Sequence, residues 1–154
     1  MATYTKYNVH VKNLCSKVID AFGSSTGSSA DTFRAVIHTD APVVATDATI
    51  SDLTQISTST ANGYSALDIE FASTISGSTV TATAAATTSN TKTWTASSGN
   101  LGDSTNCRYV SIYDDTPTSP ADPLVNYWDY GSKFTVASGN TFSINFGASL
   151  WTLA

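Results

Sequence analysis

The first patterned segment of the chain has apolar residues at intervals of three and four. These residues are Val11, Leu14, Cys15, Val18, Ile19 and Phe22, and polar side chains fill most of the positions between them. Such spacing is typical of an amphipathic helix that buries one face. Gly23 and the Ser/Thr run behind it are helix-stopping residues. We therefore predict one N-terminal helix over residues 8–22.

Beyond this helix the apolar residues alternate with polar ones, which is the period of a β-strand. The clearest strands are predicted at residues 32–38, 67–71, 106–113, 141–146 and 150–153. Turn signals separate the patterned segments, and they include Asp40-Ala41-Pro42, Asn62-Gly63, the Pro- and Asp-rich run 114–123, Gly131 and Ser138-Gly139-Asn140. Both faces of 106–113 carry apolar or aromatic residues, so we expect both faces of this strand to be covered.

Two regions are less regular. Residues 43–59 are interpreted as a loop, in which 51–56 is either one helical turn or an irregular crossing. Residues 74–95 consist mostly of Thr, Ser and Ala. Because alternating β-branched residues suit a pleated surface, this tract is predicted to form two thin strands.

These elements predict a mainly β fold: a single β-sandwich or jelly-roll-like domain of about eight or nine short antiparallel strands with one N-terminal amphipathic helix. We assign residues 8–154 to this domain and residues 1–7 to an N-terminal arm. The expected core residues are Phe33, Val36, Leu67, Ile69, Phe71, Tyr109, Ile112, Trp128, Phe142, Ile144 and Phe146.

Composition narrows the classes of function. Only 12% of the 154 residues are charged and the formal net charge is −5, whereas 47 residues are Ser or Thr. Without a cluster of Lys and Arg, binding to nucleic acid or to an anionic membrane surface is not expected. No apolar stretch is long enough to span a membrane and no secretory signal is evident, so we expect synthesis in the host cytoplasm. Cys15 and Cys107 have no metal-site spacing and are interpreted as small buried hydrophobes.

Catalytic and cofactor chemistry finds little support in the residues. The two histidines, His10 and His38, lie in no nucleophile–base motif. The carboxylates Asp114, Asp115, Asp122 and Asp129 are close in sequence but lack the alternating pattern of a calcium loop, so we interpret them as parts of a solvated loop that make local turns. We predict no catalytic residues, no metal site and no cofactor.

The aromatic run near residue 128 leaves two interpretations open. Tyr127, Trp128 and Tyr130 follow a loop, and exposed rings can stack on a carbohydrate ligand. Alternation along a strand places Trp128 and Tyr130 on the same face, which is more often a stripe of core residues.

Several stretches of the chain resemble a family of small virion proteins of tailed bacteriophages. They are the opening 1–8, the segments 31–42, 52–56 and 62–64, and the part from residue 109 onward, above all 122–132, 139–146 and 150–154. The Thr-rich middle looks enlarged, and the end is shortened at Gly147-Ala148-Ser149. The family is similar to capsid decoration, or cement, proteins, and the resemblance implies no catalytic residues.

The resemblance implies a non-enzymatic protein that binds the outer surface of the major capsid shell and stabilises it. Its partners are then the major capsid protein and further copies of itself, with closed rings, trimers first. In this interpretation Thr3, Tyr4, Lys6 and Tyr7 of the arm are candidate capsid contacts. The alternative is a tail or head-fibre component or a carbohydrate-binding adhesin that uses the aromatic run.

Overall fold

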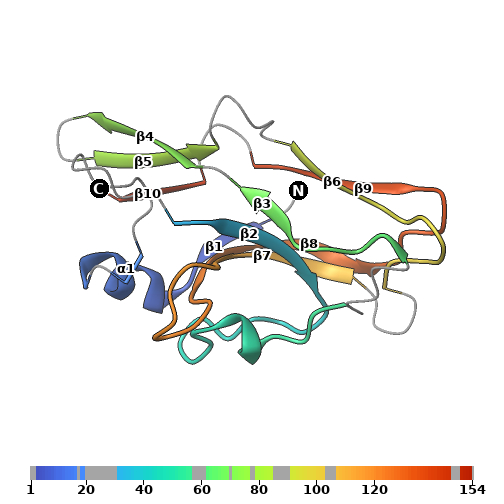
Figure 1. The fold of residues 1–154 in the computed structure, drawn as a ribbon, viewed down its shortest axis with the longest axis horizontal. Coiled ribbons are helices and arrows are strands. Elements are labelled where there is room, and N and C mark those ends of the chain that lie inside the picture. The colour runs from blue at the N-terminus through green and yellow to red at the C-terminus, as the bar shows by residue number, and fades with distance from the viewer. Residues whose placement is uncertain are drawn as a thin grey trace.

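The computed structural model describes residues 3–16, 18–19, 31–56, 62–69, 71–76, 79–84, 91–102, 107–146 and 150–153. This part of the chain contains ten β-strands in three antiparallel sheets, one α-helix and one 3₁₀ turn (Figure 1). The prediction of a mainly β, antiparallel fold with one N-terminal helix is confirmed. The strands slightly outnumber the expected eight or nine, because residues 3–6 of the predicted arm form a strand and the region 71–95 contains three strands.

The largest sheet has five strands in the order β1-β8-β7-β2-β3. They are β1 (Thr3–Lys6), β8 (Leu124–Phe134), β7 (Cys107–Asp114), β2 (Phe33–His38) and β3 (Leu67–Ile69). The central strand β7 has seven of its eight residues buried, so the prediction that both its faces are covered is confirmed. Successive side chains of β7 and of β8 therefore point into two different environments, one on each face of the sheet.

One face of this sheet packs against the two smaller sheets, which lie above it in Figure 1. These are β10-β5-β4, formed by β4 (Phe71–Ser76), β5 (Thr79–Ala84) and β10 (Trp151–Leu153), and the pair β6 (Thr91–Thr95) with β9 (Thr141–Asn145). The core between the layers contains the expected Phe33, Ile69, Ile112, Trp128, Ile144 and Phe146, while Leu67 and Phe142 are partly buried. The side chain of Phe71 lies outside the described part.

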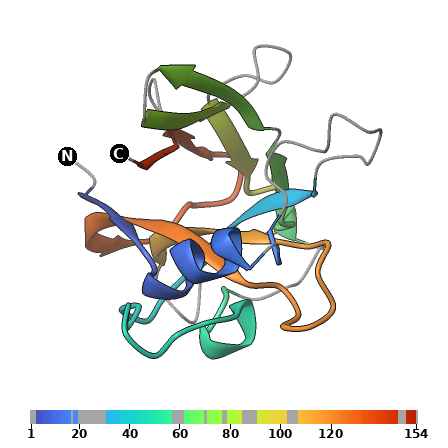
Figure 2. The same ribbon diagram turned by 90° about the vertical axis from the view of Figure 1, so that its left-hand side faces the viewer.

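The other face is covered by the helix α1 (Asn8–Cys15) and by the loop 39–56, which contains the 3₁₀ turn η1 (Ile50–Asp52) (Figure 2). A second apolar cluster forms here from Tyr7, Val36, Ile50, Leu53, Tyr113 and Leu124. The segment 43–59 is thus a loop with one helical turn, as one of the two interpretations held, although residues 57–60 lie outside the described part.

The helix differs from its prediction in length and in its buried face. It ends at Cys15, and residues 18 and 19 are not helical, whereas 17 and 20–22 lie outside the described residues. His10 and Asn13 are buried, while Val11 is 40% exposed and Cys15 is exposed. The reason is that buried Tyr7 precedes the helix, so the residues three and six positions later face the sheet. The interpretation of Cys15 as buried is wrong, and that of Cys107 is confirmed.

The predicted turn at Gly131 is also wrong, because β8 continues through it to Phe134. The pairing with β7 shifts from Tyr109 opposite Asp129 to Cys107 opposite Phe134. This irregularity is a bulge, in which extra residues of one strand face fewer residues of its partner. Gly131 has φ +95°, a conformation that glycine adopts without steric cost.

The segment 1–7 is not a separate arm in the described part of the chain. Residues 3–6 form the edge strand β1, paired along its length with β8. Tyr7, the next residue, has no exposed surface. The boundary predicted between 1–7 and 8–154 therefore falls inside a continuous structural unit, because the buried Tyr7 side chain packs against the sheet.

Candidate functional site

The two faces of the β7–β8 pair carry the two clusters of functional side chains. In the ladder Val110 pairs with Trp128, and Ser111 pairs with Tyr127. Because successive side chains in a strand point to opposite faces, Val110 and Trp128 face the smaller sheets while Ser111 and Tyr127 face the loop and helix side. The first face holds an open groove, and the second holds a buried polar network.

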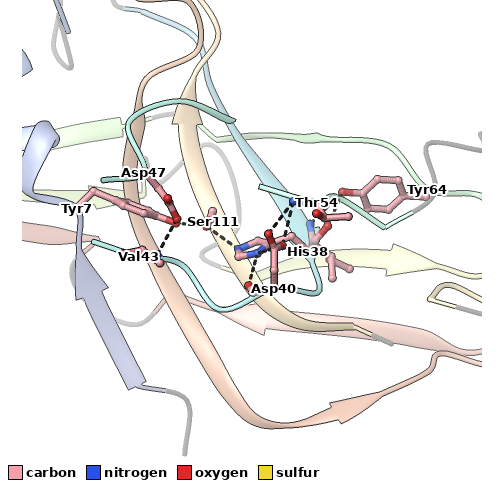
Figure 3. A network of polar contacts seen from close by, with 9 residues as sticks. Tyr7, His38, Asp40, Val43, Asp47, Thr54, Tyr64 and Ser111 are labelled. Atoms are coloured by element: carbon pink, nitrogen blue, oxygen red, sulfur yellow. Dashed lines mark hydrogen bonds and ion pairs between the residues drawn. The ribbon is translucent and has the colours of Figure 1, made fainter. Parts of the chain in front are cut away.

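The buried network is centred on Ser111 and His38 (Figure 3). His38 Nε2 lies 2.8 Å from Ser111 Oγ, and the Tyr7 hydroxyl lies 3.1 Å from the same Ser111 Oγ. His38 Nδ1 is 3.1 Å from the backbone oxygen of Asp40. The imidazole also stacks on Tyr109, with ring centroids 5.3 Å apart.

The chemistry of the partners fixes the direction of these hydrogen bonds. A carbonyl oxygen only accepts, so Nδ1–H of His38 donates to Asp40 and Nε2 is left to accept from the Ser111 hydroxyl. Ser111 Oγ in turn accepts from the Tyr7 hydroxyl. Burial lowers the pKa of His38 to about 4, and this effect exceeds the opposing influence of Asp40. The imidazole is therefore neutral at pH 7, as this chain of donors requires.

The arrangement resembles a Ser-His-Asp hydrogen-bond sequence, yet it is closed to substrate. Ser111 and His38 have no exposed surface, and the Tyr7 hydroxyl occupies the serine oxygen. The carboxylate of Asp40 lies 3.7 Å from Nδ1 and accepts the backbone N–H of Thr54 at 2.9 Å. A nucleophile must reach an external carbonyl carbon, so we interpret this network as structural.

The sequence alone does not reveal the contact between His38 and Ser111. The two network residues are 73 positions apart, and 22 serines are candidates for such a contact. Only the antiparallel register, which places Val36 opposite Ser111, brings the hydroxyl beside the imidazole.

On the opposite face a groove of about 390 Å³ opens between the five-stranded sheet and β9. It is lined by Arg108, Val110, Trp128, Tyr130, Phe142, Ser143, Ile144 and Asn145. Trp128 and Ile144 are buried residues, whereas Tyr130 is 52% exposed. The groove therefore combines an apolar interior with an accessible aromatic ring.

Arg108 also forms an ion pair, and its guanidinium carbon lies 5.0 Å from the centroid of the Tyr109 ring. Arg108 donates from Nε to Asp129 Oδ1 at 2.8 Å and from Nη2 to Asp129 Oδ2 at 2.9 Å. The backbone N–H of Gly131 also donates to Asp129 Oδ1 at 2.8 Å. The same carboxylate therefore bonds both Arg108 and the backbone of the bulge. These donors hold the pKa of Asp129 below its usual value. Arg108 thus lines the groove with its charge already balanced by Asp129, which lies on the same face as Tyr109 and does not line the groove.

The candidate stacking residues divide between the two faces. Trp128 and Tyr130 share one face, as the alternation predicted, and both line the groove. Tyr127 does not: it packs on the opposite face against Tyr7 and Tyr109, with ring centroids 5.5 and 6.2 Å away. A single ligand in the groove cannot stack on all three rings, because Tyr127 points away from the other two.

The candidate capsid contacts divide similarly. Thr3, Tyr4 and Lys6 lie in the edge strand β1, where Tyr4 is 38% exposed. Tyr7 is fully buried, and burial raises the pKa of its hydroxyl. Tyr7 is therefore not available to a partner in this structure and instead anchors the strand.

The four candidate carboxylates are not brought together. Asp129 pairs with Arg108, while Asp114 lies at the other end of β7, beside Phe33. Asp114 makes the expected local turn by accepting the N–H of Thr116, but it is buried, and burial raises its pKa to about 8. The description of a solvated loop is thus wrong for Asp114. Across the described residues, no group of three or more His, Cys, Asp or Glu side chains is placed to hold a metal ion.

Among the described segments, no helix has the length and apolar character needed to cross a bilayer. Comparison with known proteins adds no relative: no family model, no curated protein and no solved structure matches the chain.

Proposed function

We propose that this chain is a non-enzymatic virion protein that binds the outer surface of a bacteriophage capsid and stabilises the shell. The observation that carries the proposal is where the family-like segments lie. Residues 31–42, 52–56 and 109–146 supply β2, β7, β8 and β9, together with part of the loop that covers the buried network. The resemblance therefore falls on three adjacent strands of the five-stranded sheet and on β9 of the facing layer.

The buried network supports a role that depends on rigidity. It connects three segments that are distant in sequence: Tyr7, which directly follows β1, His38 at the end of β2, and Ser111 in β7. Buried side-chain networks that are satisfied rigidify a core. A protein that bridges capsid subunits needs such a fixed body and complementary surface, and it needs no perturbed catalytic group.

The edge strand β1 supports a mode of attachment. It pairs with β8 on one side and is the first strand of its sheet. A strand edge presents backbone donors and acceptors to which a further strand can pair. We propose that a capsid segment adds to this edge, with Thr3, Tyr4 and Lys6 as its nearest side chains, and that copies associate in closed rings on the shell.

The experiment is binding of the purified full-length protein to phage heads that lack it, measured by cosedimentation. Tyr4→Ala and Lys6→Glu are expected to weaken binding, whereas Val43→Ala, at a loop residue that is 53% exposed and outside the edge strand, is the matched control. Removal of residues 1–7 is unsuitable because it also removes the buried Tyr7. Absence of wild-type binding to such heads contradicts the proposal.

The second candidate is a tail or head-fibre component, and the groove at Trp128 and Tyr130 is the observation that favours it. Copy number separates the two functions. A decoration protein is present in proportion to the capsid subunits, whereas a fibre component is restricted to a few symmetric positions. Quantitative mass spectrometry of purified particles, normalised to the major capsid protein, measures this ratio.

A further inference from the structure

We propose that the groove between β8 and β9 binds a neutral saccharide unit, with the Tyr130 ring as the stacking platform and Arg108, Ser143 and Asn145 as the hydroxyl-binding residues. The groove is lined by residues of β7, β8 and β9 and by none of the edge strand β1, although the Tyr4 ring packs on Trp128 with centroids 5.5 Å apart. The inference therefore stands on its own observations and does not depend on attachment to a capsid.

The size and lining of the groove fit one small ligand. Its volume of about 390 Å³ lies near the lower end of the range of ligand pockets, roughly 300–1,000 Å³. The interior is formed by Val110, Trp128, Phe142 and Ile144, and the polar lining by Arg108, Ser143 and Asn145. A pyranose has the same division, since its ring C–H groups form an apolar face and its hydroxyls form a polar edge.

Tyr130 is a fixed platform in spite of its exposure. Its ring centroid lies 4.8 Å from that of Phe134 and 6.1 Å from that of Phe142, in tilted and edge-on arrangements. Phe142 is further supported by stacking on buried Trp94 at 6.0 Å. Because these contacts hold the ring before a ligand arrives, little side-chain ordering is required on binding.

The Arg108–Asp129 pair decides the charge of the ligand. The two side chains are 32% and 26% exposed, and they hold each other through two hydrogen bonds. A sugar hydroxyl oxygen can accept from a guanidinium N–H of Arg108 without separating the pair. An anionic ligand would have to compete with Asp129 for Arg108. The opposite wall offers Ser143 and Asn145, which are uncharged at neutral pH.

The geometry of β8 explains why such a ring is exposed at the end of a core strand. Trp128 continues the buried stripe, with its ring 4.9 Å from that of Phe146. Three residues later the bulge at Gly131 interrupts regular pairing, and the Asp129 carboxylate accepts its backbone N–H. The strand thus leaves the core between Trp128 and Tyr130, which gives the groove a buried end and an open end.

The test is saturation-transfer NMR of the full-length protein with methyl glucopyranoside, methyl galactopyranoside, methyl mannopyranoside and N-acetylglucosamine, followed by a glycan array. We expect at least one neutral sugar to bind with a dissociation constant on the order of 1 mM. Tyr130→Ala should weaken this binding roughly tenfold or more, and Tyr130→Phe should retain most of it because the aromatic face remains. Val43→Ala is the control at an exposed residue outside the groove.

Folding of each variant is checked by thermal denaturation, which should be nearly unchanged because Tyr130 is half exposed. The proposal is overturned if no neutral sugar binds, if binding survives Tyr130→Ala, or if sialic acid and other anionic sugars alone bind. Head binding of the same Tyr130→Ala variant is predicted to be unaffected, so failure of the saccharide site and failure of the capsid proposal are distinguishable.

Discussion

The buried network and the open groove lie on opposite faces of the same two strands, and they differ in what each face exposes. The network has the residue types of a hydrolase, with Ser111 hydrogen-bonded to His38, but neither side chain is exposed. The groove has no nucleophile–base pair, yet Tyr130 and Arg108 reach solvent. Accessibility therefore decides which face can meet a partner, and residue type alone would choose the wrong one.

The largest difference in stability between the two faces is expected for the substitution of two tyrosines, one buried and one half exposed. Tyr7→Ala removes a fully buried ring and its hydroxyl bond, so we expect a loss of roughly 3–5 kcal/mol in the free energy of unfolding. Tyr130→Ala, at a half-exposed ring, should cost no more than about 1 kcal/mol. Urea denaturation of both variants measures the difference, and equal losses would remove the distinction between the faces.

Acid should destabilise the network through His38. Its pKa is about 4 when folded and near 6.5 when unfolded, so the unfolded chain binds the proton first as the pH falls. The contribution of neutral His38 to the free energy of unfolding is fully present above pH 6.5. It is lost between pH 6.5 and 4, by about 3 kcal/mol in total. His10 shows the same direction, with its pKa lowered to about 4 by burial.

The measurement is the free energy of unfolding from pH 4 to pH 8 for the wild type and for His38→Gln. Because His10 and every carboxylate remain in both proteins, the difference between the two curves isolates His38. That difference should change across pH 6.5 to 4 and be flat above pH 7. Parallel curves over the whole range would show that His38 is not buried in a neutral form.

Two serines give the smallest and most specific comparison. Ser111→Ala leaves His38 Nε2 and the Tyr7 hydroxyl without their partner, so we expect a loss of about 1–3 kcal/mol. Ser143→Ala removes an exposed contact, a 2.7 Å bond to Thr93 Oγ1, and should change stability by less than about 0.5 kcal/mol. Thermal denaturation of the pair is sufficient, and a larger loss at Ser143 would contradict the assignment of faces.

The sequence was informative wherever the evidence was local. Alternation predicts a strand over residues 106–113 that is covered on both faces, and Cys107–Asp114 form it; alternation also places Trp128 and Tyr130 on the same side. Asn62-Gly63 and Ser138-Gly139 were recognised as turns, and both glycines have positive φ. These features depend on neighbouring residues, whose preferences a short window of sequence contains.

Features that depend on distant pairing were missed. The period of three and four predicted Val11 on the buried face of the helix, but attachment of Tyr7 to the sheet turned His10 and Asn13 inward. Gly131 was interpreted as a turn, whereas pairing with β7 carries the strand through it as a bulge. The contact of Ser111 with His38 also arises from register, which no local pattern encodes.

The most direct test of the proposed function is the location of this protein in a cryo-electron microscopy map of the intact virion. The proposal predicts density that fits the five-stranded sheet on the outer surface of the head, repeated with the capsid lattice and with the edge strand β1 toward a capsid subunit. Density confined to the tail or to fibres, with none on the head shell, would contradict it.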